Sequence, residues 1–153
     1  MPSAANSKSS RCPWENRFEK PALDKLLARY QPQPRGLADQ ALSELAQITA
    51  IQPALEWLGP SWRWSLAYRL PADPEPACYF IPTPDWPTLA LPVPLPIAED
   101  ILTRRGGSKY LRDVILHATQ VGQTRWAQWS IQGKAQLADV LRLAAGVIQG
   151  QPV

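Results

Sequence analysis

The side chains that could perform chemistry in this sequence are few and isolated. His117 is the single histidine among 153 residues, and it lies four positions after Asp113 on the polar face of a predicted helix. Residues at this spacing commonly form a solvated pair on a helix surface. A catalytic imidazole also needs a second reactive group, and no cysteine lies near His117 in the sequence. We therefore predict that the chain contains no catalytic residue.

The two cysteines and one acidic pair are the remaining chemical candidates. Cys12 lies near the N-terminus and Cys78 in an apolar run, without a C-x-x-C spacing or a secretory signal. We expect reduced thiols in a cytoplasmic protein, with Cys78 buried as a small hydrophobic residue. Glu99 and Asp100 are consecutive, so their side chains diverge and make a poor acid–base pair. We expect neither a cofactor nor a bound metal.

One basic segment has the composition of an anion site, because it combines cations, flexible glycines and the start of a helix. Its candidate anion-binding residues are Arg104, Arg105, Ser108, Lys109 and Arg112. The segment lacks the G-x-x-x-x-G-K-[ST] pattern of a phosphate-binding loop. A helix C-cap followed by an N-cap at Ser108 would explain the same residues without a ligand.

The elements that position these residues are organised around residues 62–70, where large apolar residues alternate with polar or small ones. A period of two predicts a strand with one buried face. The residues expected to face the core are Trp62, Trp64, Leu66, Tyr68 and Leu70. The residues expected on the opposite face are Arg63, Ser65, Ala67 and Arg69.

Apolar periodicity along the rest of the chain predicts the element order ααβββααβα. Runs of strands beside runs of helices indicate the α+β class, as two layers with an antiparallel sheet of four or five strands backed by helices on one face. We expect residues 1–19 to form a disordered tail and residues 20–150 to form one domain. In this order, residues 53–58 continue a helix and residues 108–121 form another.

The strand predicted at residues 88–97 contains Pro92, Pro94 and Pro96 at alternate positions. Alternate N–H groups of a strand point to the same neighbour, so all three missing donors lie on one side. We predict an edge strand that is blocked against further pairing. A polyproline II segment is the alternative.

Composition limits the function only loosely. The net charge of +3 falls short of the dense basic face of a dedicated nucleic-acid-binding protein. The longest uncharged stretch, residues 86–98, is too short and too rich in proline to span a membrane. The 45% of hydrophobic residues can build one core.

The succession of motifs resembles the YdhG-like group of small uncharacterised bacterial domains. The motifs are Glu56-Trp57-Leu58-Gly59-x-x-Trp62-x-Trp64, Ala77-Cys78-Tyr79-Phe80-Ile81-Pro82, a helix at 108–121, Trp126-x-x-Trp129-x-Ile131 and a helix at 137–148. The resemblance implies a two-layer fold of secretion-chaperone-like type, without established catalytic residues. One branch of that group is similar to frataxin-like iron chaperones in proposed role. Such a role uses clustered carboxylates, whereas the acidic residues here are scattered.

These patterns favour a non-catalytic domain that binds a protein partner or a small ligand at the sheet face. The candidate contact residues are Arg63, Ser65, Arg69, Trp126 and Gln128, and a homodimer is the simplest arrangement. An ordinary solvated sheet face would explain the same residues. The alternatives are binding of an anionic ligand or nucleic acid through residues 104–112, and iron handling by analogy with the resembled group.

Overall fold

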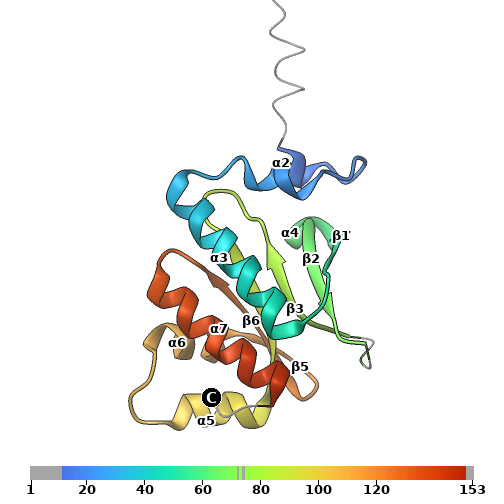
Figure 1. Cartoon of the computed structure of the whole chain (residues 1–153). Helices are drawn as coiled ribbons and strands as arrows, with labels where there is room; N and C mark the ends of the chain where they lie inside the picture. The colour runs from blue at the N-terminus through green and yellow to red at the C-terminus, as the bar shows by residue number, and fades with distance from the viewer. Residues whose placement is uncertain (1–11, 72, 74, 151–153) are drawn as a thin grey trace, which may run out of the picture.

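The structure of the chain, a computed structural model, describes residues 12–71, 73 and 75–150. Six antiparallel strands form one sheet in the order β1-β2-β3-β4-β6-β5. The strands are β1 (Ala54–Trp57), β2 (Trp64–Arg69), β3 (Pro76–Ile81), β4 (Thr88–Pro94), β5 (Thr119–Val121) and β6 (Thr124–Ser130). The sheet is backed by helices, which confirms the predicted two-layer α+β class (Figure 1).

Two long helices, α3 (Pro32–Thr49) and α7 (Lys134–Gln149), lie side by side over one face of the sheet (Figure 1). The side chain of Gln149 donates to the carbonyl of Ile48 at 3.0 Å and joins their ends. Helices α5 (Leu95–Thr103) and α6 (Lys109–His117) pack against β4 and β6. Three short helices complete the fold of the described residues: η1 (Pro13–Glu15), α2 (Leu23–Leu27) and α4 (Gly59–Trp62).

The sheet has six strands instead of the four or five predicted, because two short segments pair at its edges. Residues 54–57 were expected to continue a helix, but α3 ends at Thr49, where Ala50 adopts a left-handed conformation with φ 55°. Residues 119–121 were expected to end a helix and instead form β5. Strands of three or four residues are too short to display a periodicity, so pairing with β2 and β6 decides their conformation.

The prediction that the proline-rich strand lies at an edge is wrong, because β4 lies between β3 and β6. Its register with β6 runs to Pro94, but its register with β3 stops at Ala90. Proline supplies no N–H, so the donors toward β6 come from the alternate residues Leu91 and Val93. Pro92 and Pro94 therefore lie where β4 pairs on one side only. Pro96 lies in the first turn of α5.

The main core lies between the sheet and the helices. Phe80 of β3 and Trp129 of β6 are fully buried there, and they pack with Leu137 and Leu143 of α7 in one apolar cluster. Leu66 and Tyr68 of the central strand belong to the same cluster, and Trp64 is also buried, as the alternation predicts. This core holds α3 and α7 against the sheet and leaves the opposite face for other contacts.

A second, smaller apolar cluster contains Trp14, Leu26, Trp64, Ile81 and Ala90. Trp14 is only 6% exposed, and the indole Nε1–H of Trp64 donates to the carbonyl of Asn16 at 2.7 Å. Phe18, in contrast, is 84% exposed. Residues 12–19 of the predicted tail thus contact the domain through Trp14, and residues 1–11 lie outside the described residues.

Candidate functional site

Three aromatic side chains gather on the face of the sheet opposite α3 and α7. Trp62 comes from α4, Tyr79 from β3 and Trp126 from β6, and all three are half-buried. The ring centroids lie 4.9 Å apart for Trp62 and Tyr79, 6.0 Å for Trp62 and Trp126, and 5.8 Å for Tyr79 and Trp126. These spacings are typical of mutually attractive aromatic rings. We call the three residues the outer aromatic cluster.

The backbone brings Trp62 to this face, which corrects the prediction that it faces the core. Gly59 and Pro60 begin the single turn of α4, and the N–H of Leu58 donates to the carbonyl of Arg63 at 2.8 Å to close it. Arg63 has φ 53°, so the alternation of β2 begins only at Trp64. A left-handed residue just before a strand changes which face the preceding side chain occupies.

Small side chains beneath the cluster give the rings room. Ser65, Ala67 and Ala90 are at most 1% exposed, and Ala90 packs in the same cluster as Trp62 and Tyr79. The hydroxyl of Ser65 donates to the carbonyl of Trp62 at 2.8 Å. The face of β2 that was expected to be accessible is therefore covered at Ser65 and Ala67 by the protein's own rings, and Ser65 is too deeply buried to contact a partner.

The other predicted contact residues have different environments. Arg63 forms an ion pair with Glu15 at 2.8 Å, and its guanidinium lies 4.9 Å from the centroid of the Trp14 ring. It therefore holds the N-terminal segment. Arg69 is exposed and forms an ion pair with Glu56 at 2.9 Å. Gln128 is exposed on the same face of β6 as Trp126.

Trp126 lies between two grooves and lines both. The side groove, between α6 and β6, has a volume of about 420 Å³ and is lined by Asp113, Val114, His117, Ala118, Thr119, Trp126 and Gln128. The end groove, where β3 and β4 separate, has a volume of about 610 Å³. It is lined by Leu70, Asp73, Glu75, Pro76, Ala77, Pro92, Pro94, Val121, Thr124, Trp126, Val147 and Ile148.

The charged groups along the two grooves are predominantly acidic. The end groove carries Asp73 and Glu75, the side groove carries Asp113, and none of the described lining residues is Lys or Arg. Burial raises the pKa of the Tyr79 hydroxyl, the charge of Arg69 opposes this, and the Glu56 and Glu75 carboxylates raise the pKa further. The local negative charge contrasts with the net charge of +3 of the whole chain.

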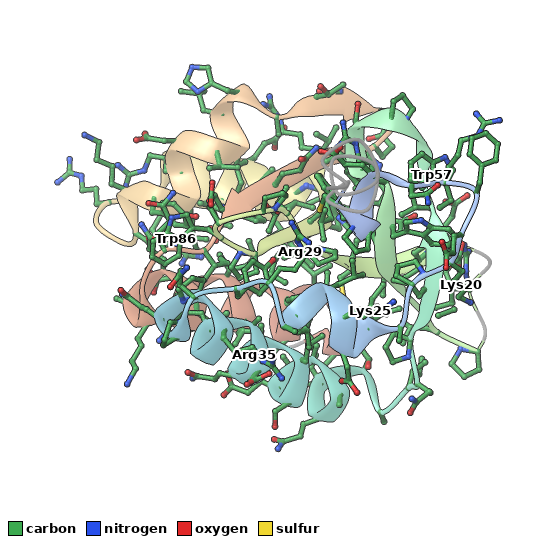
Figure 2. All side chains as sticks on the ribbon, turned by 90° about the horizontal axis from the view of Figure 1, so that it is seen from above. Lys20, Lys25, Arg29, Arg35, Trp57 and Trp86 are labelled. Carbon is green, nitrogen blue, oxygen red and sulfur yellow. The ribbon has the colours of Figure 1, made fainter. Side chains whose placement is uncertain are left out.

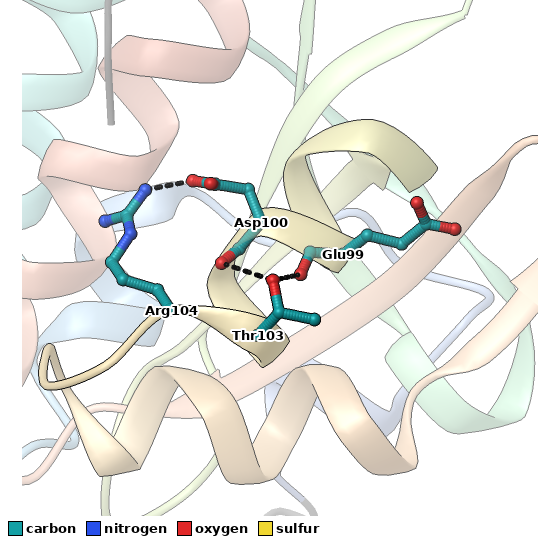
Figure 3. Close-up of polar contacts among 4 residues, drawn as sticks. All are labelled: Glu99, Asp100, Thr103 and Arg104. Atoms are coloured by element: carbon teal, nitrogen blue, oxygen red, sulfur yellow. Dashed lines mark hydrogen bonds and ion pairs between the residues drawn. The ribbon is translucent and has the colours of Figure 1, made fainter.

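The predicted anion-binding segment directs much of its polar capacity to its own turn. Arg104 pairs with Asp100 (Figure 3), and the Ser108 hydroxyl accepts the N–H of Leu111 at 3.3 Å as a helix cap. Arg112 donates to the carbonyl of Gly106. Arg105 and Lys109 are exposed. The five residues thus lie on the connection from α5 to α6 and on the first turn of α6, and anion binding there stays a prediction.

The remaining chemical candidates stay apart from each other. The Nδ1 atom of His117 lies 2.9 Å from the backbone carbonyl of Asp113 instead of its carboxylate. Cys78 is 1% exposed, which confirms its predicted burial. Within the described residues, no three His, Cys, Asp or Glu side chains gather in a group that could hold a metal ion. Iron handling therefore receives no support from the arrangement of these side chains.

Comparisons with known proteins gave no matching family model, no similar curated protein and no similar solved structure. The resemblance to the YdhG-like group stays a prediction. In the part of the chain that the structure describes, no helix combines the length and apolar character needed to cross a membrane.

The buried thiol of Cys78 makes stability depend on pH. Burial raises its pKa from 9.0 to about 12, so between these values the unfolded chain releases a proton that the folded protein keeps. The free energy of unfolding therefore does not depend on this thiol's titration below pH 9, and it falls as the pH rises from 9 toward 12. Relative to a Cys78→Ala variant, the wild type should lose about 1 kcal/mol between about pH 8 and about pH 10 in urea unfolding. A difference in the free energy of unfolding between the two proteins that stays constant with pH would contradict the raised pKa of Cys78.

Proposed function

We propose that this protein is a non-catalytic binding domain whose outer aromatic cluster binds a basic segment of a partner protein. The observation that carries the proposal is the position of Trp126, a half-buried ring in contact with two others, between two grooves whose charged groups are predominantly carboxylates. Both free cysteines are compatible with a reducing, cytoplasmic location, which we also propose.

The chemistry of the surface fits lysine and arginine side chains. An aromatic ring attracts a cation over its face, and a ring with exposed area also packs against the apolar stem of such a side chain. Asp73 and Glu75 in the end groove, and Asp113 in the side groove, supply opposite charge. A peptide that crosses Trp126 would place a basic residue in each groove.

The cluster is organised before any partner binds, which limits the entropy lost on binding. Tyr79 and Trp126 come from strands of one sheet, and the Ser65 hydroxyl fixes the carbonyl of Trp62. A rigid aromatic anchor in a groove is a common source of binding energy at protein interfaces. Most of the conformational entropy lost on binding would therefore be lost by the partner segment.

The alternative partners fit this surface less well. The carboxylates of the grooves repel the phosphates of nucleic acid. A homodimer through the same face would bring the acidic grooves of two copies together, because a twofold axis pairs a patch with itself. Light scattering should accordingly give a monomeric mass, and a dimer that Trp126→Ala converts to monomer would favour self-association over a basic partner.

The proposal is tested with three peptides that differ only in charge, each made of several repeats of Arg-Leu-Ser, of Gln-Leu-Ser or of Glu-Leu-Ser. Isothermal titration calorimetry should show the arginine peptide binding about tenfold more tightly than the glutamine peptide, and the glutamate peptide binding most weakly. Raising the salt concentration should reduce the difference, because it screens charges at the surface. Equal affinity for the arginine and glutamate peptides would overturn the proposal.

A further inference from the structure

A separate cavity lies at the end of the molecule seen in Figure 2, where Arg29 is labelled. It has a volume of about 210 Å³ and is lined by Cys12, Trp14, Leu26, Arg29, Tyr30, Pro82, Pro84 and Asp85. The Tyr30 hydroxyl donates to the carbonyl of Thr83 at 2.7 Å and so ties two of its walls together. The cavity shares no lining residue with the two grooves beside Trp126.

Two opposite charges line this cavity without pairing. Arg29 and Asp85 are both exposed, and neither forms an ion pair or a side-chain hydrogen bond with another described residue. The cavity therefore offers one site for a carboxylate and another for an ammonium group.

A buried donor at the same place also lacks a partner. Trp14 is 6% exposed, and within the described residues its indole Nε1–H donates no hydrogen bond. Its Nε1 atom is covered by other protein atoms, so a ligand in the cavity that Trp14 lines would contact the tryptophan without using this donor.

The backbone at Asp85 is held in an unusual conformation. Asp85 has φ 72°, and the N–H of Trp86 donates to the carbonyl of Pro84 at 2.9 Å across it. This is a γ-turn with positive φ, which is rare and strained for a residue other than glycine. The turn fixes the carboxylate-bearing residue at the rim of the cavity.

We infer that this cavity binds a small zwitterion of amino-acid size with an apolar side chain. Arg29 would bind the carboxylate, and Asp85 would bind the ammonium group. Leu26, Tyr30 and the two prolines would contact the apolar side chain. Typical ligand pockets measure about 300–1,000 Å³, so the occupant of this one has to be small.

The ligand requirement is tested by calorimetry with L-phenylalanine, 3-phenylpropionate and phenethylamine, and with L-leucine and its two matching analogues. The amino acids should bind, and the analogues that lack the amine or the carboxylate should bind about tenfold more weakly or worse. Analogues that bind as tightly as their parent amino acids, or a complete absence of binding by both amino acids, would overturn the inference.

Matched variants test the residues. Arg29→Gln and Asp85→Asn should each weaken amino-acid binding about tenfold, and asparagine tolerates the positive φ of Asp85. Lys25→Gln and Asp24→Asn change exposed charges on α2 that do not line the cavity, so they should leave binding unchanged. Thermal melts identify any variant that fails to fold. Equal weakening by the α2 controls would show that general charge, and not this cavity, is responsible.

Cys12 provides a readout that does not depend on variants. It is half-buried at the cavity, whereas Cys78 is buried and its thiol has a raised pKa, so a maleimide should react with Cys12 first. Saturating L-phenylalanine should slow this reaction severalfold. An alkylation rate unaffected by amino acids would overturn the inference.

The same alkylation assay separates this inference from the proposed function. The outer aromatic cluster and its two grooves share no residue with the lining of this cavity. The arginine peptide should therefore leave the alkylation rate of Cys12 unchanged, whether or not it binds at Trp126. A rate that the peptide slows as strongly as L-phenylalanine does would place the peptide in this cavity and overturn the proposed function, while the inference would still be decided by the amino acids and their analogues.

Discussion

Replacing Trp129 by alanine is expected to lower the free energy of unfolding by about 3–5 kcal/mol, the range for removal of a large buried aromatic side chain. Trp129 is fully buried in the core between the sheet and the helices, and it pairs in register with Leu89 of β4. Its loss would leave a cavity that the surrounding side chains can fill only by moving. Urea unfolding followed by circular dichroism measures the change.

Phe18 is the matched control for this prediction, because it is aromatic and 84% exposed. Phe18→Ala should change the free energy of unfolding by no more than about 0.5 kcal/mol. Trp129→Phe should cost less than Trp129→Ala, since it keeps a ring and removes a buried Nε1–H that has no acceptor among the described residues. Similar losses for Trp129→Ala and Phe18→Ala would contradict the assigned core.

Trp126→Ala is expected to weaken binding of the arginine peptide by about 2 kcal/mol or more, which corresponds to about 30-fold in Kd. Trp126 contacts Trp62 and Tyr79 and lines both grooves, so its removal takes away the ring and opens the surface around it. Calorimetry with the arginine peptide measures the effect. This is the largest effect on binding that we expect from a single substitution.

Trp57→Ala is the control for general loss of an aromatic side chain. Trp57 is also half-buried and contacts another ring, that of Trp64 at 5.8 Å, but it lines neither groove. Its replacement should lower stability without changing peptide affinity. A Trp57→Ala variant that loses binding as strongly as Trp126→Ala would place the interaction elsewhere.

The fold class and much of the core were predictable from the sequence, for a physical reason. Alternation in a strand indicates which side chains share a face, so the burial of Trp64, Leu66 and Tyr68 is predicted correctly. Leu70 lies beyond the end of β2 and is only half-buried, and Ser65 and Ala67 on the opposite face are buried as well. The alternation failed at Trp62 because one residue with positive φ changes the face, and a positive φ at an arginine has no sequence signal.

The proline pattern shows a second limit. Alternating prolines correctly indicate that one side of a strand lacks donors, but they do not say how far the neighbouring strand extends. Because pairing with β3 stops at Ala90, the prolines beyond it are accommodated in an inner strand. The edge strands β1 and β5 carry no proline within their bounds.

The candidate site was predictable only in part. Trp126 and Gln128 follow from the alternation of one strand, and the structure leaves both at least partly accessible. Trp62 and Tyr79 join Trp126 through the order and register of the sheet, which single-strand patterns do not contain. The acidic character of the two grooves also depends on the tertiary structure. Their carboxylates come from the loop before β3 and from helix α6, which are far apart in the chain.

The central claim, binding of a basic segment across the outer aromatic cluster, is tested most directly by the indole N–H signals in a ¹⁵N-labelled protein. Each of the seven tryptophans gives its own signal once assigned by single Trp→Phe replacements. Titration with the arginine peptide should shift the signals of Trp62 and Trp126 and leave those of Trp57 and Trp129 in place. Shifts at Trp57 with none at Trp62 and Trp126 would contradict the account.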